Sequence, residues 1–305
     1  MKFIHKRNAD ATAWTVAFAV AGTLAVVVNI LTLYIFFKTK ALRARKHVMI
    51  INLGVADLLF LATGIPLYVI HVLQPSIISF LMLHIFSRLS KLASVITLAV
   101  IAVERMHATV RPLRHKVLSS RLFIRTVELI WISAAILTTF TTLEITGVVK
   151  HDSISSILVP TITILVIAVI VSCYVIIWIT FQGRRRQNLG DLIDQEKEKA
   201  LAVTLLLVSG GFMVTWSPPM LYLAITRVCS SCIQPSQTRM GWVFLLFAIQ
   251  SLINPIIYCL RLPMFKVTLK ADVKRIYLKC FRRSFGTSVR QSAIHPEIQE
   301  VSTGV

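Results

Sequence analysis

Seven long apolar runs recur along the 305-residue chain, and they limit its fold more than any other feature. A helix needs roughly 20 apolar residues to cross the hydrocarbon core of a bilayer. Each backbone group in that core must find a hydrogen-bond partner inside its own segment, so such runs are expected to be helical. We place the spans at residues 12–37, 47–73, 78–108, 123–149, 155–181, 199–226 and 240–260. The predicted fold class is all-α, a bundle of seven transmembrane helices.

Composition and charge also fit a membrane protein better than a soluble domain. Hydrophobic residues make up 56% of the chain and charged residues only 15%, which is little charge for a soluble surface. The net charge of +20 would suit a nucleic-acid-binding protein, but the basic residues lie in short gaps between the apolar runs. That placement is typical of a membrane protein whose cytoplasmic side meets anionic lipids. We therefore expect membrane lipids as partners and no nucleic acid.

The lysines and arginines of the short loops predict the orientation. They are concentrated after the first, third and fifth spans and in the segment after the seventh. Because basic loops stay on the cytoplasmic side, residues 1–11 are expected outside the cell and the C-terminus in the cytoplasm. The bundle at 12–260 then lies in the plasma membrane. An odd number of spans puts the two ends on opposite sides, so the count and the charges agree.

An amphipathic helix is predicted after the last span, at residues 261–283. Apolar residues recur there at helical spacing with basic residues between them, which is typical of a short helix lying on the inner leaflet. The apolar residues are Leu262, Phe265, Leu269, Val273 and Ile276. Cys280 is a candidate for palmitoylation, with a plain surface thiol as the alternative. Residues 284–305 show no apolar period, and we expect a disordered cytoplasmic tail there.

Polar and charged residues inside the spans are costly in lipid and are therefore candidates for function. They are Asn29, Asp57, Arg88, Lys91, Glu104 and Arg105 in the first three spans and Asn254 in the seventh. Prolines also interrupt the later runs, at Pro218 and Pro219 in the sixth and Pro255 in the seventh. Each proline removes a backbone hydrogen bond and bends its helix.

Four motifs lie on these spans, namely NLGVADLLF at 52–60, ERM followed by RPL at 104–113, FMVTWSPP at 212–219 and NPIIY at 254–258. They resemble the landmark motifs of the rhodopsin-like (class A) G-protein-coupled receptors and occur in that family's order. The resemblance covers the chain from Asn29 to Phe265. It implies a receptor rather than an enzyme, one that binds an extracellular ligand and activates a heterotrimeric G protein by rearranging its helices. It also implies arrestin and receptor kinases as partners.

The resemblance implies a sodium pocket as well. Its residues are Asp57, Ser94, Ser251 and Asn254. A carboxylate and hydroxyls can hold a hard cation between helices, and sodium there would favour the inactive packing. The alternative is a buried carboxylate that is hydrogen-bonded to Asn29 and Asn254, and both descriptions can hold at once. No other cofactor is expected.

The Glu104–Arg105 pair resembles the D/E-R-Y motif at the inner end of the third helix. The resemblance implies that Arg105 pairs with Glu104 and Glu198 in the off state and is then released to contact the G protein. A bidentate pair of arginine and carboxylate suits such a latch. Pro112 and Leu113 are expected to contact the G protein too. The alternative is that Arg105 only extends to the headgroups.

The sixth helix carries Phe212, Trp216 and Pro218, which resemble the family's switch. The proline gives a hinge about which the inner half of the helix can swing. Tyr258, with the Asn-Pro that opens its motif, is expected to support the opened state together with Tyr174 of the fifth helix. Simple core packing is the alternative for Phe212 and Trp216.

The family's ligand pocket lies in the outer half of the bundle. The residues expected to face a ligand are His84, Ser87, Arg88 and Lys91 of the third helix with Trp216 and Met220 of the sixth. We hypothesise that Arg88 and Lys91 bind an anionic group, such as a carboxylate or phosphate on a small or lipid-like ligand. The alternative for Lys91 is internal pairing with Asp57, in the place of the sodium ion. Arg88 could similarly pair with Glu144.

Two positions bear on the ligand class. Ser87 stands where aminergic receptors have an aspartate, which disfavours an amine ligand. Ala248 stands where opsins have the lysine that binds retinal, which disfavours photoreception.

Other positions depart from the family pattern. Phe80 stands where most members have a third-helix cysteine, and the loop at 147–154 has no cysteine to pair with it. Val166 replaces the mid-span proline of the fifth helix. These departures resemble melanocortin, cannabinoid and lysophospholipid receptors, and the C-S-S-C of the third external loop resembles adenosine receptors. Cys229 and Cys232 are candidates for a local disulfide, with free thiols as the alternative.

A transporter or channel is the alternative function class. Such proteins are commonly built from internal repeats, with broken helices in matching positions of two halves. The chain shows neither pattern.

Overall fold

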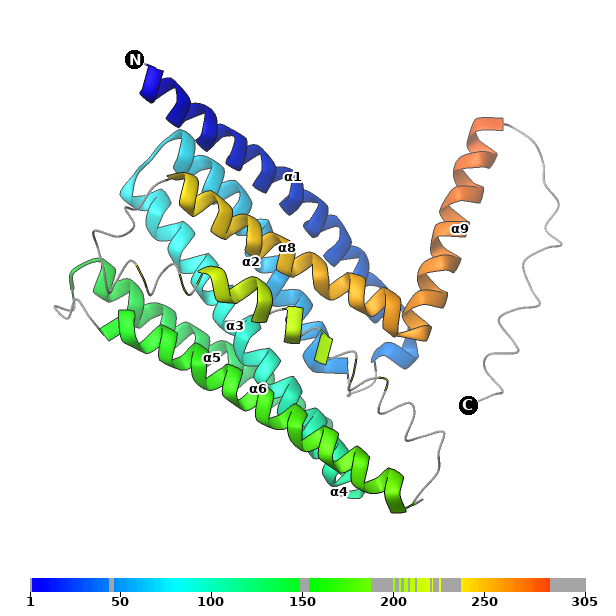
Figure 1. The fold of residues 1–305 in the computed structure, drawn as a ribbon. Coiled ribbons are helices and arrows are strands. Elements are labelled where there is room, and N and C mark those ends of the chain that lie inside the picture. Colours follow the sequence, from blue (N-terminus) through cyan, green and yellow to red (C-terminus); the bar gives the residue numbers. More distant parts are fainter. Residues whose placement is uncertain are drawn as a thin grey trace.

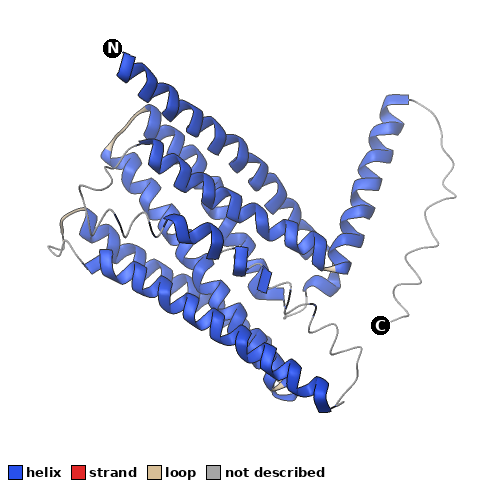
Figure 2. Cartoon of the chain, viewed as in Figure 1, coloured by secondary structure: helices blue, strands red, loops and turns tan. Residues whose placement is uncertain are grey.

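The computed structural model describes residues 2–43, 47–148, 154–187 and 237–285, with part of the stretch 200–225. Every regular element among them is a helix (Figure 2). The elements are α1 (Lys2–Lys38), η1 (Lys40–Arg43), α2 (Val48–Leu73), α3 (Ile77–Val110), α4 (Pro112–Lys116), α5 (Ser120–Ile145), α6 (Ile154–Gln187), α8 (Gln237–Arg261) and α9 (Pro263–Phe285). The fold class is all-α, as predicted.

Six helices in the described part of the chain are long and apolar enough to cross a membrane. The segments are Thr15–Lys38, Val48–Leu73, Ile77–Val110, Ser120–Ile145, Thr161–Gly183 and Gly241–Leu260. They coincide with six of the seven predicted spans. The remaining span, at 199–226, falls on the partly described stretch, whose described residues are helical.

The helix ends differ from the predicted ends by a few residues, and most at two places. α1 begins at Lys2, well before the predicted span at residue 12. α6 runs to Gln187, past the predicted end at residue 181. Both extensions lack proline and carry alanine, lysine, arginine or glutamine, which are good helix formers. The apolar pattern therefore predicts the part of each helix that crosses the lipid, and the helix itself can continue beyond that part.

α3 lies at the centre of the bundle and contacts α2, α5 and α6, while α1 contacts α2 and α8 (Figure 1). The side chains from Ser90 to Val95 are all buried, so α3 is surrounded on every face along that stretch. On the periphery, apolar residues such as Leu129, Ile136 and Trp178 are exposed. An apolar outer surface is what a bundle surrounded by lipid requires.

α9 leaves the bundle at the end of α8 and diverges from it (Figure 1). The start of α9 is packed against the bundle, since Phe265 in its first turn and Leu262 just before it are buried. Asp272 forms an ion pair with Lys38 of α1. Val273 is exposed, so only the first part of the predicted apolar stripe packs against the helices.

The N-terminal end of α3 is joined to α2 and α5 by histidines and an aromatic ring. His71 Nδ1 lies 3.0 Å from Ser79 Oγ, and the ring of Phe80 lies 5.9 Å from that of His71 and 6.4 Å from that of His84. His84 Nε2 is in turn 3.5 Å from Thr141 Oγ1 on α5. Phe80 occupies the position of the expected cysteine, so these contacts hold the joint without a disulfide there.

Candidate functional site

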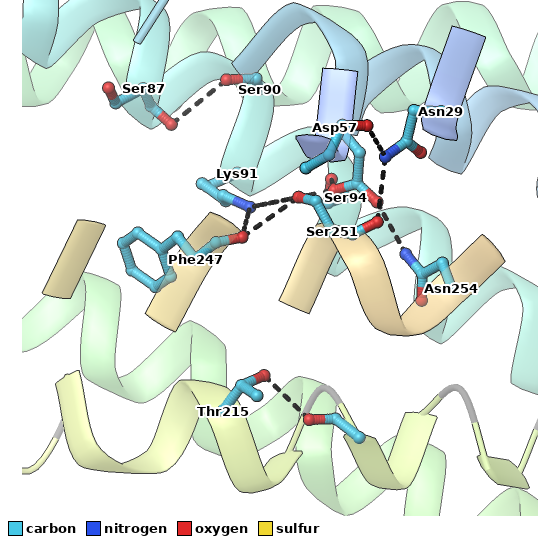
Figure 3. A network of polar contacts seen from close by, with 12 residues as sticks. Asn29, Asp57, Ser87, Ser90, Lys91, Ser94, Thr215, Phe247, Ser251 and Asn254 are labelled. Carbon is cyan, nitrogen blue, oxygen red and sulfur yellow. Dashed lines mark hydrogen bonds and ion pairs between the residues drawn. The ribbon is translucent and has the colours of Figure 1, made fainter. Parts of the chain in front are cut away.

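A cluster of buried polar side chains joins the middle of α1, α2, α3 and α8 (Figure 3). We call it the polar core. Its members are Asn29 of α1, Asp57 of α2, Lys91 and Ser94 of α3, and Ser251 and Asn254 of α8. All six are almost fully buried. Four distant segments of the sequence therefore contribute to one site.

Asp57 is the centre of the polar core. Asn254 Nδ2 donates a hydrogen bond to Asp57 Oδ2 at 2.7 Å, and Ser94 Oγ donates to Oδ1 at 3.3 Å. Lys91 Nζ lies 3.8 Å from the same Oδ1 atom. Because Asp57 is 0% exposed, these protein donors replace the water that an ionised carboxylate needs.

Lys91 is surrounded by acceptors and aromatic rings. Its Nζ donates to Ser251 Oγ and to the Phe247 backbone carbonyl, each at 3.4 Å. The same nitrogen lies 4.0 Å from the ring centroid of Phe60 and 5.2 Å from that of Phe247. The rings offer negatively polarised faces to the ammonium group, so the buried charge is balanced on several sides.

Asn29 ties α1 to the polar core. Its Nδ2 donates to the Ala25 carbonyl at 2.9 Å and to the Ser251 carbonyl at 3.0 Å. The second bond satisfies a backbone oxygen of α8 and positions the serine that accepts from Lys91. α1 is thus linked to Asp57 through Ser251 and Lys91, and not by a direct bond from Asn29.

The sodium pocket implied by the resemblance can be tested against this arrangement. The oxygen donors are present, since Asp57, Ser94 and Ser251 lie together. Lys91 Nζ, however, already lies 3.8 Å from Asp57 Oδ1 and donates to Ser251 Oγ. A metal cation would have to bind beside a positive charge at close range, which is strongly unfavourable in a buried site. The residues as arranged do not fit sodium.

A short path of contacts leads from Lys91 to the sixth span. The ring of Phe247 lies 4.8 Å from that of Trp216, and Trp216 is buried. Thr215 Oγ1 donates to the Gly211 carbonyl at 2.8 Å. Pro218 is exposed and Pro255 is buried. Phe212, the other predicted switch residue of this span, lies outside the described residues, as do Met220 and Glu198.

The predicted ligand residues of the third span lie in the N-terminal half of α3. His84, Ser87 and Arg88 are half-buried, whereas Lys91 is 4% exposed and directed at Asp57. Among the described residues, the Ser87 hydroxyl is buried and has no hydrogen-bond partner. The structure therefore places Lys91 in the polar core and the other three residues farther out.

The predicted latch lies at the far end of α3. Arg105 Nη2 is 2.5 Å from Glu104 Oε1, and Arg105 is almost completely buried. His115 Nε2 of α4 lies 3.5 Å from the same Glu104 oxygen. Leu113, one of the two predicted G-protein contacts, is 78% exposed on α4, and Pro112 is exposed beside it. The latch and an exposed apolar side chain thus share one end of the bundle.

The two tyrosines that are predicted to support the opened state, Tyr174 of α6 and Tyr258 of α8, are both buried. Tyr174 Oη is 3.5 Å from Ser209 Oγ of the sixth span. Tyr258 is buried, and its hydroxyl has no hydrogen-bond partner among the described residues. A buried hydroxyl without a partner is unfavourable, so another arrangement of the helices could satisfy it.

Three contacts were not foreseen from the sequence. They are the contact of His115 with Glu104, the packing of the Phe60 and Phe247 rings around Lys91, and a hydrogen-bond chain through Asn52. Trp131 Nε1 donates to Asn52 Oδ1 at 2.9 Å, and Asn52 Nδ2 donates to Thr97 Oγ1 at 2.8 Å. The one sequence signal for this chain was the position of Asn52 at the start of the NLGVADLLF motif.

The cysteine predictions are largely outside the described residues. Cys229 and Cys232 lie there, and their pairing stays a prediction. Cys280 falls within α9, and its palmitoylation also stays a prediction.

Comparison with known families agrees with the bundle and its motifs. Residues 28–258 match the family described as "7 transmembrane receptor (rhodopsin family)". The chain belongs to this family of G-protein-coupled receptors, and it is a multi-pass membrane protein.

Individual relatives are similar over parts of their length. Melanopsin-B of Xenopus laevis is 23% identical over 290 residues, which cover 83% of this chain and 53% of that protein. The muscarinic acetylcholine receptor M3 of Rattus norvegicus is 32% identical over 105 residues, 34% of this chain and 18% of that receptor. "Probable G-protein coupled receptor No18" of Amphibalanus amphitrite is 34% identical over 98 residues, 32% of this chain and 22% of that protein. The chain thus spans about half of these relatives or less. The predicted hints of a melanocortin, cannabinoid, lysophospholipid or adenosine subgroup stay predictions.

Proposed function

We propose that this receptor lies in the plasma membrane with its N-terminus outside, and that it converts the binding of an extracellular ligand into nucleotide exchange on a heterotrimeric G protein. The observation that carries the proposal is the buried Arg105, paired with Glu104 at 2.5 Å beside the exposed Leu113. Burying an arginine is costly, so a buried arginine in a span is a candidate for a role that a neutral residue cannot fill. The excess of basic residues in loops at this end supports its cytoplasmic location.

In the off state Glu104 holds Arg105 inside the bundle. Activation requires the sixth helix to move outward at this end, so that Arg105 and Leu113 can contact the G protein. An agonist can drive that movement only by binding the open arrangement more tightly than the closed one. Shifting a 1:99 population to 99:1 takes roughly a 10⁴-fold difference in affinity.

The path through Phe247 supports the coupling between the ligand region and the hinge. Its carbonyl accepts from Lys91, and its ring packs against Trp216. Pro218 lies just beyond Trp216, where a bend allows the inner part of the helix to swing. Tyr258, whose hydroxyl is unsatisfied here, gains a partner near Tyr174 in the open state.

For the ligand, we propose an anionic group bound near Arg88. Of the two basic residues on this face of α3, Lys91 lies in the polar core beside Asp57, whereas Arg88 lies nearly a turn closer to the start of α3, where we propose that a ligand carboxylate or phosphate binds. The buried Ser87 hydroxyl, which has no partner among the described residues, can donate to the same group. His84, Trp216 and Met220 complete the proposed pocket.

Arrestin and receptor kinases are proposed partners of the tail at 284–305. A palmitoyl chain on Cys280 would hold the end of α9 at the membrane. Both ideas rest on family resemblance and on the residue types of this segment.

A cell-based panel of heterotrimeric G proteins tests the coupling. Wild type should raise nucleotide exchange on at least one G protein when expressed or stimulated with a ligand library. Arg105→Ala should abolish this signal at equal surface expression, and Arg111→Ala at an exposed position should retain it. A signal that survives Arg105→Ala contradicts the latch. Substrate flux without any G-protein signal would favour a transporter or channel instead.

The ligand class needs a separate test. Libraries of carboxylates and phosphates should include agonists whose potency falls steeply in Arg88→Gln and less in Arg88→Lys. Ser87→Ala should also reduce the potency of these agonists. Agonists found only among cationic or neutral compounds contradict the anionic assignment but leave the receptor assignment intact.

A further inference from the structure

Lys91 places a fixed positive charge at the position where a cation is expected from the family resemblance. Its Nζ lies 3.8 Å from Asp57 Oδ1 and 3.4 Å from Ser251 Oγ. These two oxygens belong to the donor set that the family resemblance implies for sodium. Lys91 is 4% exposed, so its ammonium group is a component of the packed interior.

We propose that the Lys91 ammonium group is the resident cation of this bundle, and that the receptor neither needs nor responds to sodium. The inference goes beyond the proposed function, because it concerns the stability of the packed helices and not their coupling to a partner. The oxygen donors suit a cation, but the Lys91 ammonium group already lies among them. The proposal follows from these two observations.

The surroundings of Lys91 match the capacity of an ammonium group. Such a group has three N–H donors and no acceptor. Three oxygens face it, those of Asp57, Ser251 and the Phe247 carbonyl. The Phe60 ring, at 4.0 Å from Nζ, covers a further side with a favourable cation–π contact. Lys91 Nζ thus provides these oxygens with the positive charge that a metal ion would otherwise supply.

A tethered cation differs from a dissolved one in a measurable way. A bound ion stabilises the state that binds it by a free energy that rises with the logarithm of the ion concentration, once that concentration exceeds the dissociation constant. Lys91 is covalently part of the chain, so its contribution does not depend on the salt outside the cell. The wild-type stability should therefore be the same in sodium as in a large organic cation.

The experiment is thermal unfolding of the purified, ligand-free receptor in sodium chloride or choline chloride at equal ionic strength. The wild-type midpoint should agree between the two salts to within about 1 °C. Lys91→Ala and Lys91→Ser each vacate the position and leave Asp57 available. Their midpoints should rise by about 3–6 °C in sodium at ten times its dissociation constant.

The double variant Lys91→Ala/Asp57→Asn is the matched control. It removes the carboxylate as well, so its midpoint should not respond to sodium. A response of the double variant equal to that of Lys91→Ala would show a general salt effect and overturn the proposal.

Two other results would also overturn it. One is a wild-type midpoint that rises in sodium as it does in the variants. The other is a lack of sodium response in both single variants, since the oxygens would then form no cation site. If one single variant does not fold, the other carries the comparison, and the wild-type result stands by itself. The readout needs no G protein, so a failure here leaves the proposed function untouched.

Discussion

Removing one partner of the Lys91–Asp57 pair should destabilise the bundle far more than removing both. Lys91→Met keeps the length and apolar stem of the side chain but leaves the Asp57 carboxylate without its counter-charge. Asp57→Asn keeps the shape and leaves the ammonium group unpaired. The double variant replaces both charges and retains most of the packing.

The magnitude follows from the separation of the charges. For Lys91 Nζ and Asp57 Oδ1 at 3.8 Å, Coulomb's law with an effective dielectric constant of about 20 gives about 4 kcal/mol. Measured losses on breaking a buried ion pair by removing one partner are similar, about 3–5 kcal/mol. For a domain of this size that corresponds to a fall in Tm of about 6–20 °C. Replacing both partners is often close to neutral, because no charge is left buried.

The assay is thermal unfolding in detergent, in sodium-free buffer so that no metal ion can take the vacated place. The four proteins form a double-mutant cycle, and the coupling energy between the two sites should be about 3 kcal/mol or more. Lys270→Met, at an exposed position of α9, serves as the control and should change the free energy of unfolding by about 0.5 kcal/mol at most.

A coupling energy below about 1 kcal/mol would refute the reasoning. It would mean that Asp57 is already balanced by Asn254 and Ser94, and that Lys91 contributes little to the stability of the folded bundle.

Three further substitutions test other contacts. Asn52→Ala removes the hydrogen bond from Trp131 and the one to a buried threonine of α3, and should lower the free energy of unfolding by about 1–2 kcal/mol in thermal denaturation; no loss would contradict that chain of bonds. Gly211→Ala would bring a Cβ atom to 2.9 Å from Ile253 Cγ2, and the resulting overpacking of the sixth span against α8 should cost about 1–3 kcal/mol in the same assay; an unchanged Tm would show that the Ile253 side chain moves aside without cost. Asp272→Asn removes the ion pair between α9 and α1, and should cost only about 0.2–1 kcal/mol, an effect that shrinks at high salt; a larger loss at high salt would point to packing rather than charge.

The spans were predictable because a bilayer imposes a minimum length on any helix that crosses it. That constraint fixes the apolar core of each helix but not its ends. α1 continues back to Lys2 and α6 on to Gln187, where the chain no longer has to be apolar and only helix propensity applies.

The polar core was predictable in its members and not in its connections. Asp57 and Asn254 belong to recognisable motifs, so their proximity could be expected. Lys91 lies on the same face of α3 as Ser87 and Ser94, one turn from each. Its long stem can reach outward toward a ligand or inward toward a carboxylate, and sequence spacing does not decide between them. The acceptors of α8 and the ring of Phe60 decide it in the structure.

Contacts between distant segments were missed for a related reason. The bond between Trp131 and Asn52 joins positions 79 residues apart, and neither residue has a periodic pattern that points to the other. His115 reaches Glu104 only because α4 folds back against α3 after Pro112. Such pairs follow from helix packing, which the one-dimensional pattern does not contain.

The joint at the N-terminal end of α3 has a consequence for how the helices can move there. Because His71, Phe80, His84 and Thr141 hold it by stacking and hydrogen bonds, it can open and re-form without any change of redox state. Side-chain and loop motions occur within picoseconds to microseconds, whereas the disulfide of most family members would tie α3 to the loop at 147–154 until it was reduced. The contacts between α2, α3 and α5 at this end can therefore rearrange in the same way under reducing and oxidising conditions.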